Sequence, residues 1–375
     1  MKSIQFYLGL TALVLYGSSM AQSESKNLDF GDTEPVFEVQ ELFNDERFPN
    51  VVTAMDGSIV ASWGSENFRV RRSEDGGTTW GPEIPIVNPG FQGGGTTVDE
   101  TTGDIFVFVE EEHPIAPLHV FRSRDHGKTW KEVDFKLEPN SLGHIPSMHM
   151  NEHGITLKNG KHAGRLIRPS RYYGDGNTKD YWDGHYTNAI YSDDGGKIWK
   201  ASEPFPAYGT GEATLAELSD GTIYYNSRRH KSTDGKNPRM RYIAWSSDGG
   251  ETWGNLSISD VLPDGDQNRD YGLMAGLVRL PIEGKDVLLY SNVDSEAGRK
   301  NGTVWASFDG GKTWPIKKVA EKGVFAYSSL NAGRDGTPSE GLIYLLYESE
   351  KGAKIARFNL AWLLEGQDEH IFDGN

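Results

Sequence analysis

The chain has 375 residues, of which 36% are hydrophobic and 25% are charged. This length can bury a large core, while the composition is too polar for a membrane protein. The formal net charge of −16 makes nucleic acid and anionic membrane surfaces poor partners, because both repel an acidic surface. The chain contains no cysteine, which excludes disulfides and thiolate metal sites.

The first 21 residues have the pattern of a secretory signal peptide. Lys2 supplies a positive charge, residues 6–16 form an apolar run, and Ser19-Met-Ala21 places small residues before a cleavage position near Ala21. The apolar run is too short to span a bilayer as a helix. We therefore expect a periplasmic or secreted protein that is not inserted in the membrane, with residues 22–34 as a short N-terminal segment.

A turn motif, S-x-D-x-G-x-x-W, repeats along the chain. Its five copies begin at residues 73, 123, 192, 246 and 307, which are 50, 69, 54 and 61 residues apart. In such a turn the Ser and Asp side chains bond to the local backbone, Gly adopts a positive φ, and Trp packs between strands. Four copies carry Thr before the Trp, and Ile198 replaces it in the third. These Asp boxes predict hairpins, not five carboxylate active sites.

The spacing of the boxes predicts the architecture. Short strands with a repeat near sixty residues are typical of a propeller with four-stranded blades. The 354 residues after the signal (375 − 21) give 59 residues per blade for six blades. The predicted fold is therefore an all-β, six-bladed β-propeller formed by residues 35–375. We expect a strand near Val36–Val39 to complete the last blade and residues 174–184 to border the site. The strand-like runs are Ile105–Val109, Ile223–Tyr225, Val287–Tyr290 and Leu342–Tyr347.

Several segments between Arg47 and Leu363 resemble motifs of bacterial sialidases of the six-bladed propeller type. Phe48 departs from the family pattern, which has Ile after this Arg. The resemblance implies an exo-glycosidase that needs no cofactor and acts on a terminal acidic sugar of an oligosaccharide. The matching segments are Arg47-Phe-Pro; Glu212 with Glu217-Leu-Ser-Asp-Gly and Asn226-Ser-Arg228; Leu288-Leu-Tyr-Ser-Asn with Gly298-Arg299; Ala326-Tyr327-Ser-Ser-Leu; and Leu346-Tyr-Glu348.

The resemblance assigns the substrate carboxylate to three arginines, Arg47, Arg228 and Arg299. Guanidinium groups suit this task because they bind a carboxylate through planar, charge-assisted hydrogen bonds. Arg229 is next in the chain to Arg228 and is an alternative to it. The resemblance implies that Glu348 orients Arg47.

The resemblance also implies that Tyr327 is the nucleophile and that Glu212 is its base. A neutral phenol avoids repulsion by the substrate carboxylate, and sialidases are the exception among glycosidases in using one. A phenol with a pKa near ~10 needs a base, which a neighbouring carboxylate can supply.

One departure concerns the general acid. Sialidases carry an Asp in the loop between the first two strands of the first blade, but no Asp lies between Asp56 and Asp75 here. A general acid contributes roughly 10²–10⁴ to the rate. Glu66 is one candidate to replace it.

The same scaffold also suits a second chemistry. Arginines that neutralise a carboxylate acidify the neighbouring C–H group, so that a Tyr or His can remove the proton and an oxygen can leave. This would be a dehydratase or lyase acting on uronic-acid-terminated oligosaccharides, such as fragments of ulvan. His113 and His149 are the candidate acid or base residues, and three more histidines lie in linking stretches: His144, His185 and His230. A third alternative is a propeller that binds glycans without catalysis, which would not need the Tyr–Glu pair.

A metal site is not expected. Residues from Asp264 to Asp270 resemble the start of a calcium loop, but Arg269 stands where Gly is needed and Ala275 where the bidentate Glu should be. The expected partner is therefore an acidic oligosaccharide, with no cofactor, metal or nucleic acid.

Overall fold

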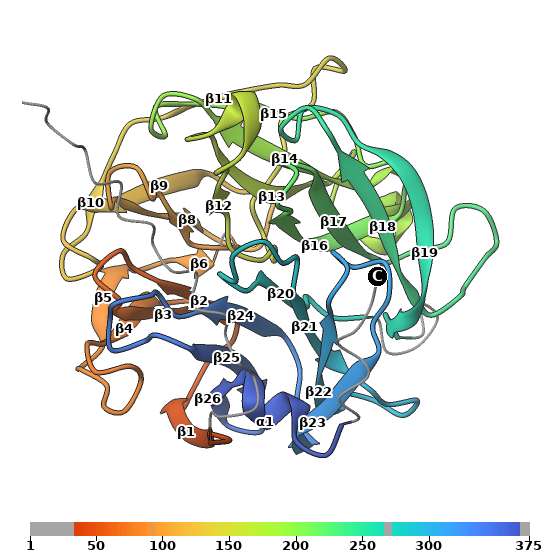
Figure 1. Ribbon diagram of the computed structural model, residues 1–375. Helices are drawn as coiled ribbons and strands as arrows, with labels where there is room; N and C mark the ends of the chain where they lie inside the picture. Colours follow the sequence, from red (N-terminus) through yellow and green to blue (C-terminus); the bar gives the residue numbers. More distant parts are fainter. Residues whose placement is uncertain (1–33, 93, 266–271, 368–375) are drawn as a thin grey trace, which may run out of the picture.

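The strands of the described residues form six sheets that surround a central axis as blades (Figure 1). The computed structural model describes residues 34–92, 94–265 and 272–367. The prediction of an all-β, six-bladed propeller is confirmed. The predicted signal peptide, residues 1–21, lies outside the described residues.

The first three blades follow the chain in order. The strands of blade 1 are β2 (Asn50–Thr53), β3 (Ile59–Trp63), β4 (Phe68–Ser73) and β5 (Ile84–Val87). Those of blade 2 are β6 (Phe91–Gln92), β7 (Thr97–Val98), β8 (Ile105–Glu110), β9 (Leu118–Ser123) and β10 (Lys131–Glu132). Those of blade 3 are β11 (Lys136–Glu138), β12 (Ile155–Thr156), β13 (Leu166–Tyr172), β14 (Tyr186–Ser192) and β15 (Ile198–Ala201).

Blades 4 to 6 complete the ring. The strands of blade 4 are β16 (Thr210–Glu217), β17 (Ile223–Arg229), β18 (Met240–Ser246) and β19 (Gly254–Pro263). Those of blade 5 are β20 (Gly276–Arg279), β21 (Leu288–Val293), β22 (Lys300–Ser307) and β23 (Ile316–Val324). Those of blade 6 are β24 (Ser328–Ala332), β25 (Leu342–Ser349), β26 (Gly352–Asn359) and β1 (Phe37–Phe43). Short helices are η1 (Gly160–His162), η2 (Lys179–Gly184) and α1 (Leu360–Leu364).

The two ends of the propeller meet in blade 6. Strand β1 pairs antiparallel with β26, with Phe37 opposite Phe358 and Glu41 opposite Lys354. The strand predicted near Val36–Val39 therefore completes the last blade. This pairing closes the ring, because one sheet contains both the first and the last strand of the described residues.

Each Asp box forms the hairpin between the last two strands of its blade. In the first box, the hydroxyl of Ser73 donates to Asp75 at 2.8 Å, and Thr79 donates to the same carboxylate from its backbone N–H at 2.9 Å and its hydroxyl at 2.6 Å. In the third box, Ile198 retains only the backbone bond, to Asp194 at 3.0 Å. The boxes are thus held by local side-chain bonds, as the motif predicts.

The core lies between neighbouring blades. One cluster joins side chains of blades 3 and 4, including Ile167, Leu215 and Trp253. Gly250 of the fourth box has a φ of 86°, and a Cβ at this position would lie 2.0 Å from Ile167 Cδ1 in blade 3. Glycine therefore satisfies both the turn and the close approach of the next blade.

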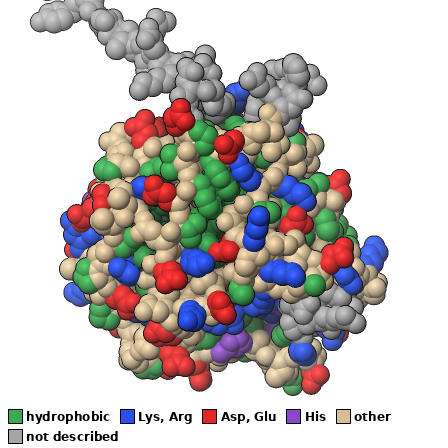
Figure 2. All heavy atoms as spheres, turned by 90° about the horizontal axis from the view of Figure 1, so that it is seen from below, with side chains coloured by type: hydrophobic (Ala, Val, Ile, Leu, Met, Phe, Trp, Pro, Cys, Tyr) green, Lys and Arg blue, Asp and Glu red, His purple; other side chains and the backbone are tan. Residues whose placement is uncertain are grey.

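The surface mixes both signs of charge. On the face shown in Figure 2, acidic and basic side chains are interspersed around exposed hydrophobic groups. The negative net charge is therefore not gathered into one patch on this face. No helix in the described part of the chain is long and apolar enough to cross a membrane.

Loss of a box carboxylate is expected to destabilise the fold. Asp248 accepts bonds from Ser246, Glu251 and Thr252, so Asp248→Ala leaves several donors without their partner. We expect the free energy of unfolding to fall by about 1–3 kcal/mol in urea titrations. Asp260→Ala, which removes an exposed aspartate from β19, is the matched control. Equal stability of the two variants would contradict a structural role for the box.

Candidate active site

The residues assigned to the substrate carboxylate and to the nucleophile come from four blades. They lie at or next to strand ends, where loops and strand termini of different blades meet. Arg47 precedes β2, Arg228 is the penultimate residue of β17 and lies beside Glu212 on β16, Arg299 precedes β22, Tyr327 precedes β24, and Glu348 is on β25.

A buried chain of hydrogen bonds links Tyr327, Glu212 and Arg228. The Tyr327 hydroxyl donates to Glu212 Oε1 at 3.0 Å, and Arg228 Nη1 donates to Glu212 Oε2. Arg228 Nη1 also lies 3.4 Å from the Tyr327 hydroxyl oxygen. The three residues are 8%, 3% and 2% exposed, respectively, so little water competes for these bonds.

Electrostatic effects shift the pKa values of the Glu212 carboxylate and the Tyr327 phenol in opposite directions. Burial alone would raise the pKa of Glu212, but the charge of Arg228 and hydrogen bonds from Arg228 and His230 outweigh it and hold this pKa well below its usual value. Burial and the Glu212 charge raise the pKa of Tyr327, against the opposing effect of the nearby arginines. At neutral pH Glu212 is therefore ionised and accepts a hydrogen bond from a protonated phenol.

A local irregularity brings Glu212 to this position. The pairing of β16 with β17 shifts register between Thr210 and Ala213, and the two residues between them are Gly211 and Glu212. A Cβ on Gly211 would lie 1.8 Å from His230 Nδ1, so glycine is needed for the histidine ring to pack here. His230 Nε2 in turn lies 3.5 Å from Glu212 Oε1. Sequence reasoning gave His230 no separate role, because this contact arises only from the folded bulge.

The structure places Glu348 against Arg47. Arg47 donates from Nε and Nη2 to the two carboxylate oxygens of Glu348, both at 3.0 Å. The same carboxylate accepts the backbone N–H groups of Phe48 at 3.2 Å and Tyr327 at 3.4 Å. A bidentate pair of this kind fixes the plane of the guanidinium group. Phe48 adopts a φ of 81°, a conformation that bulky residues rarely tolerate outside functional sites.

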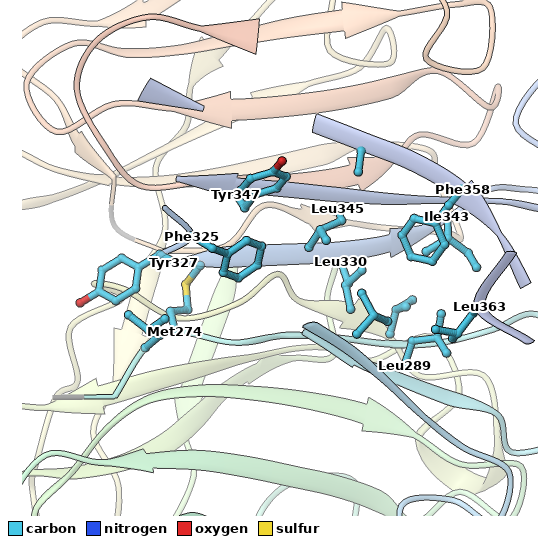
Figure 3. Packing of buried hydrophobic residues seen from close by; sticks show 14 of the residues in the cluster. Met274, Leu289, Phe325, Tyr327, Leu330, Ile343, Leu345, Tyr347, Phe358 and Leu363 are labelled. Carbon is cyan, nitrogen blue, oxygen red and sulfur yellow. The ribbon is translucent and has the colours of Figure 1, made fainter. Parts of the chain in front are cut away.

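Arginines surround the ring of Tyr327. The Cζ atoms of Arg299 and Arg47 lie 5.0 Å and 5.2 Å from the ring centroid. Figure 3 shows Tyr327 at one end of a buried hydrophobic cluster, with its hydroxyl pointing away from the other labelled side chains. The apolar cluster therefore holds the ring, while the hydroxyl faces the polar groups.

Arg229 does not share this position. Its guanidinium group bonds to Asp234 at 3.0 Å, to Thr233 at 3.1 Å and to Tyr242. The alternative that Arg229 replaces Arg228 is therefore wrong. Consecutive residues of a strand point to opposite faces of the sheet, and on β17 it is Arg228 that reaches Glu212.

The candidate acid or base residues differ in their placement. His113 and His149 pack together with ring centroids 4.6 Å apart, and His149 lies 5.8 Å from the ring of Phe48. Burial is the main cause of a lowered pKa in both histidines. Glu66 lies in the exposed turn between β3 and β4, where its backbone N–H is bound by Glu46. No contact between the Glu66 side chain and Tyr327 or Glu212 occurs in the described structure.

The stretch that resembled a calcium loop is only partly described. Asp264 is buried and accepts Arg241 Nη1 at 3.0 Å and the backbone N–H of Arg229 at 2.7 Å. Residues 266–271 lie outside the described residues. Across the described ranges, no group of three or more His, Asp or Glu side chains is arranged to hold a metal ion.

The contact between Gly211 and His230 can be tested by stability alone. Gly211→Ala forces the histidine ring away, and we expect it to reduce the free energy of unfolding by about 1–3 kcal/mol. The penalty should be smaller when the same change is made in a His230→Ala background, because the clash is gone. Urea unfolding of the four proteins gives the coupling energy. Additive effects of the two changes would show that the ring does not occupy this place.

Comparisons with known proteins agree with this geometry. The family described as BNR repeat-like domain matches residues 93–340, about two-thirds of the chain. A sialidase from Micromonospora viridifaciens is 32% identical over 96% of this chain, and one from Bacteroides fragilis is 25% identical over 81%. The chain spans 60% of the length of each of these two relatives. The structure of a Hadza microbial sialidase, Hz136, has a TM-score of 0.64 at 25% identity, covering 84% of this chain and 66% of that one. The chain therefore belongs to the BNR repeat-like domain family, with the six-bladed propeller of the sialidase superfamily.

Proposed function

We propose that this protein is an exo-glycosidase that releases a terminal acidic sugar of the sialic acid class from oligosaccharides. The observation that carries the proposal is the buried hydrogen bond between Tyr327 and an ionised Glu212, with three guanidinium groups around it. The sialidase relatives support the same chemistry. Export, expected from residues 1–21, is part of the proposal because such oligosaccharides are met outside the cell.

Each residue has a defined task in this reaction. Arg47, Arg228 and Arg299 bind the sugar carboxylate and fix the anomeric carbon beside the phenol. Glu212 accepts the Tyr327 proton while the phenol oxygen forms a bond to the anomeric carbon and the glycosidic oxygen leaves. Water then displaces the phenol oxygen and completes hydrolysis. A neutral nucleophile suits a substrate whose carboxylate lies next to the reacting carbon.

The leaving oxygen needs a proton. Among the described aspartates and glutamates, the side chains that contact Tyr327 are those of Glu212 and Glu348, and Glu348 is bound by Arg47. If no side chain supplies that proton, substrates with a good leaving group react faster, because their leaving oxygen depends less on being protonated. We therefore expect an aryl sialoside to be cleaved faster than a sialyl-oligosaccharide, by up to roughly 10²–10⁴ in kcat/KM. Equal rates would indicate that a general acid operates here.

Elimination is the second candidate. The observations that favour it are the lack of Asp between Asp56 and Asp75, the exposed position of Glu66, and the paired histidines His113 and His149 beside the site. Product masses separate the two reactions. Hydrolysis of 4-methylumbelliferyl N-acetylneuraminic acid adds water across the cleaved bond, whereas a dehydratase removes one water from a uronic-acid oligosaccharide without cleavage. Binding without turnover on both substrates would leave only a glycan-binding role.

Removal of the phenol oxygen is the most direct mechanistic test. Tyr327→Phe keeps the ring packed but removes the nucleophile, so we expect kcat to fall at least ~10³-fold while ligand affinity changes little. Tyr344→Phe is the matched control, because Tyr344 is also a buried tyrosine but belongs to another hydrophobic cluster. The measurement is steady-state hydrolysis together with calorimetric binding. Full activity of Tyr327→Phe would remove this residue from the mechanism.

A further inference from the structure

The candidate site has more positive than negative charge. Glu348 pairs with Arg47, and Glu212 pairs with Arg228. Arg299 and a fourth arginine, Arg171, form no ion pair with a carboxylate among the described residues. Four guanidinium groups less two carboxylates leave two positive charges, in a chain whose formal net charge is −16. Arg299 is partly buried and Arg171 is fully buried, and an unpaired buried charge is costly, so this excess indicates an anionic ligand.

The backbone of Arg171 is held in place by two hydrogen bonds. It lies near the end of β13, where its N–H donates to the Ser147 carbonyl at 2.9 Å and its own carbonyl accepts the Ser147 N–H at 2.8 Å. Its Cζ atom lies 4.5 Å from the ring centroid of Tyr173. The residue is 3% exposed, which is close to the value for Arg228. Its burial is therefore similar to that of an arginine assigned to the substrate.

The neighbours of Arg171 do not neutralise it. Arg171 Nη2 donates to His185 Nδ1 at 2.9 Å, and His185 Nε2 donates to the Gly176 carbonyl at 2.8 Å, so this histidine is a neutral acceptor. The buried acid Glu110 is engaged by the Ser147 hydroxyl and the Met148 N–H instead. Burial raises the pKa of Glu110 to about 8, which leaves it largely protonated at neutral pH.

Three buried polar atoms around this position lack a hydrogen-bond partner. They are Arg171 Nε, the Tyr173 hydroxyl and His149 Nδ1. The ring of Tyr173 lies 6.4 Å from that of His149, so the three side chains are neighbours. Buried polar groups in folded proteins are nearly always bonded, and a cluster of exceptions beside a binding site is best explained by a ligand that supplies the partners.

The position connects with the catalytic residues. The ring of Tyr173 also contacts His185 at 5.1 Å, and His149 packs against Phe48, which stacks on Tyr327 at 6.0 Å. Burial, followed by the charges of Arg228 and Arg171, holds the pKa of His230 well below its usual value. His230 in turn lies 3.5 Å from Glu212, so a chain of contacts and charge effects connects Arg171 with the residues around Tyr327.

We propose that Arg171, with Tyr173 and His149, binds a second anionic substituent of the substrate. A sulfate ester or a further carboxylate has the acceptor oxygens that the guanidinium and phenol groups require. The inference rests on the proposed function: the preferred substrate is an oligosaccharide whose terminal acidic sugar, or the sugar next to it, carries this second charge.

Selenate, which has the shape and charge of sulfate, can locate both sites in crystals. We expect anomalous selenium peaks within hydrogen-bond distance of Arg171 and at the group formed by Arg47, Arg228 and Arg299. A peak at the three arginines without one at Arg171 would overturn this inference and leave the proposed function standing. A peak at Arg171 alone would support the inference and count against the proposed carboxylate site.

Variants test the same assignment in solution. We expect the sulfate dissociation constant of this site, obtained from thermal stabilisation at constant ionic strength, to rise roughly 10- to 100-fold in Arg171→Gln. Arg171→Lys keeps the positive charge without the planar guanidinium group. Its sulfate dissociation constant should lie between those of Arg171→Gln and the wild type, so this variant can be used if Arg171→Gln does not fold. Arg124→Gln, at an exposed arginine, is the charge-matched control. Equal sulfate stabilisation in the Lys variant, the control and the wild type would refute the site.

Discussion

The site depends on one carboxylate that stays ionised although it is buried. Taken alone, Glu212 would be protonated in such surroundings, because burial penalises its charge. The guanidinium group of Arg228 reverses this, and the phenol of Tyr327 supplies a further hydrogen bond to the same carboxylate. Breaking this pair would leave an uncompensated buried charge, so the arginine stabilises the proposed base in addition to its proposed role in binding the substrate. The proposed nucleophile, its proposed base and one of the proposed carboxylate-binding groups are thus joined by hydrogen bonds.

The propeller supplies the rigidity that this unit needs. The five boxes fix hairpins within their blades, and close contacts such as that between Gly250 and Ile167 set the spacing of neighbouring blades. The residues of the candidate site lie at or next to strand ends of blades that pack against one another in a closed ring. A reacting group displaced by an ångström loses much of the benefit of orientation, which favours a closed ring over flexible loops.

The sequence was informative where the physics is local. The Asp boxes depend on bonds within five residues, so their turns and the number of blades could be predicted from spacing. The roles of Tyr327, Glu212 and Glu348 came from the resemblance, and the structure places these residues together with Arg47, Arg228 and Arg299. Sequence alone could not decide between Arg228 and Arg229, because alternation along a strand does not say which face meets the site. Arg171 was not predicted, and His230 was named only as one of several histidines in linking stretches, since their contacts join segments that only the fold brings together.

Ring closure has a consequence for how the protein matures. Arg47 and Glu348 are 301 positions apart, yet their contact sets the orientation of one proposed carboxylate-binding group. Contacts between such distant segments form late, because the intervening chain must first lose much of its freedom. A nascent or truncated chain that has formed five blades would therefore have most of its core, but its proposed ligand-binding site would be incomplete. The protein would become able to bind its ligand in a single step, when β1 pairs with β26.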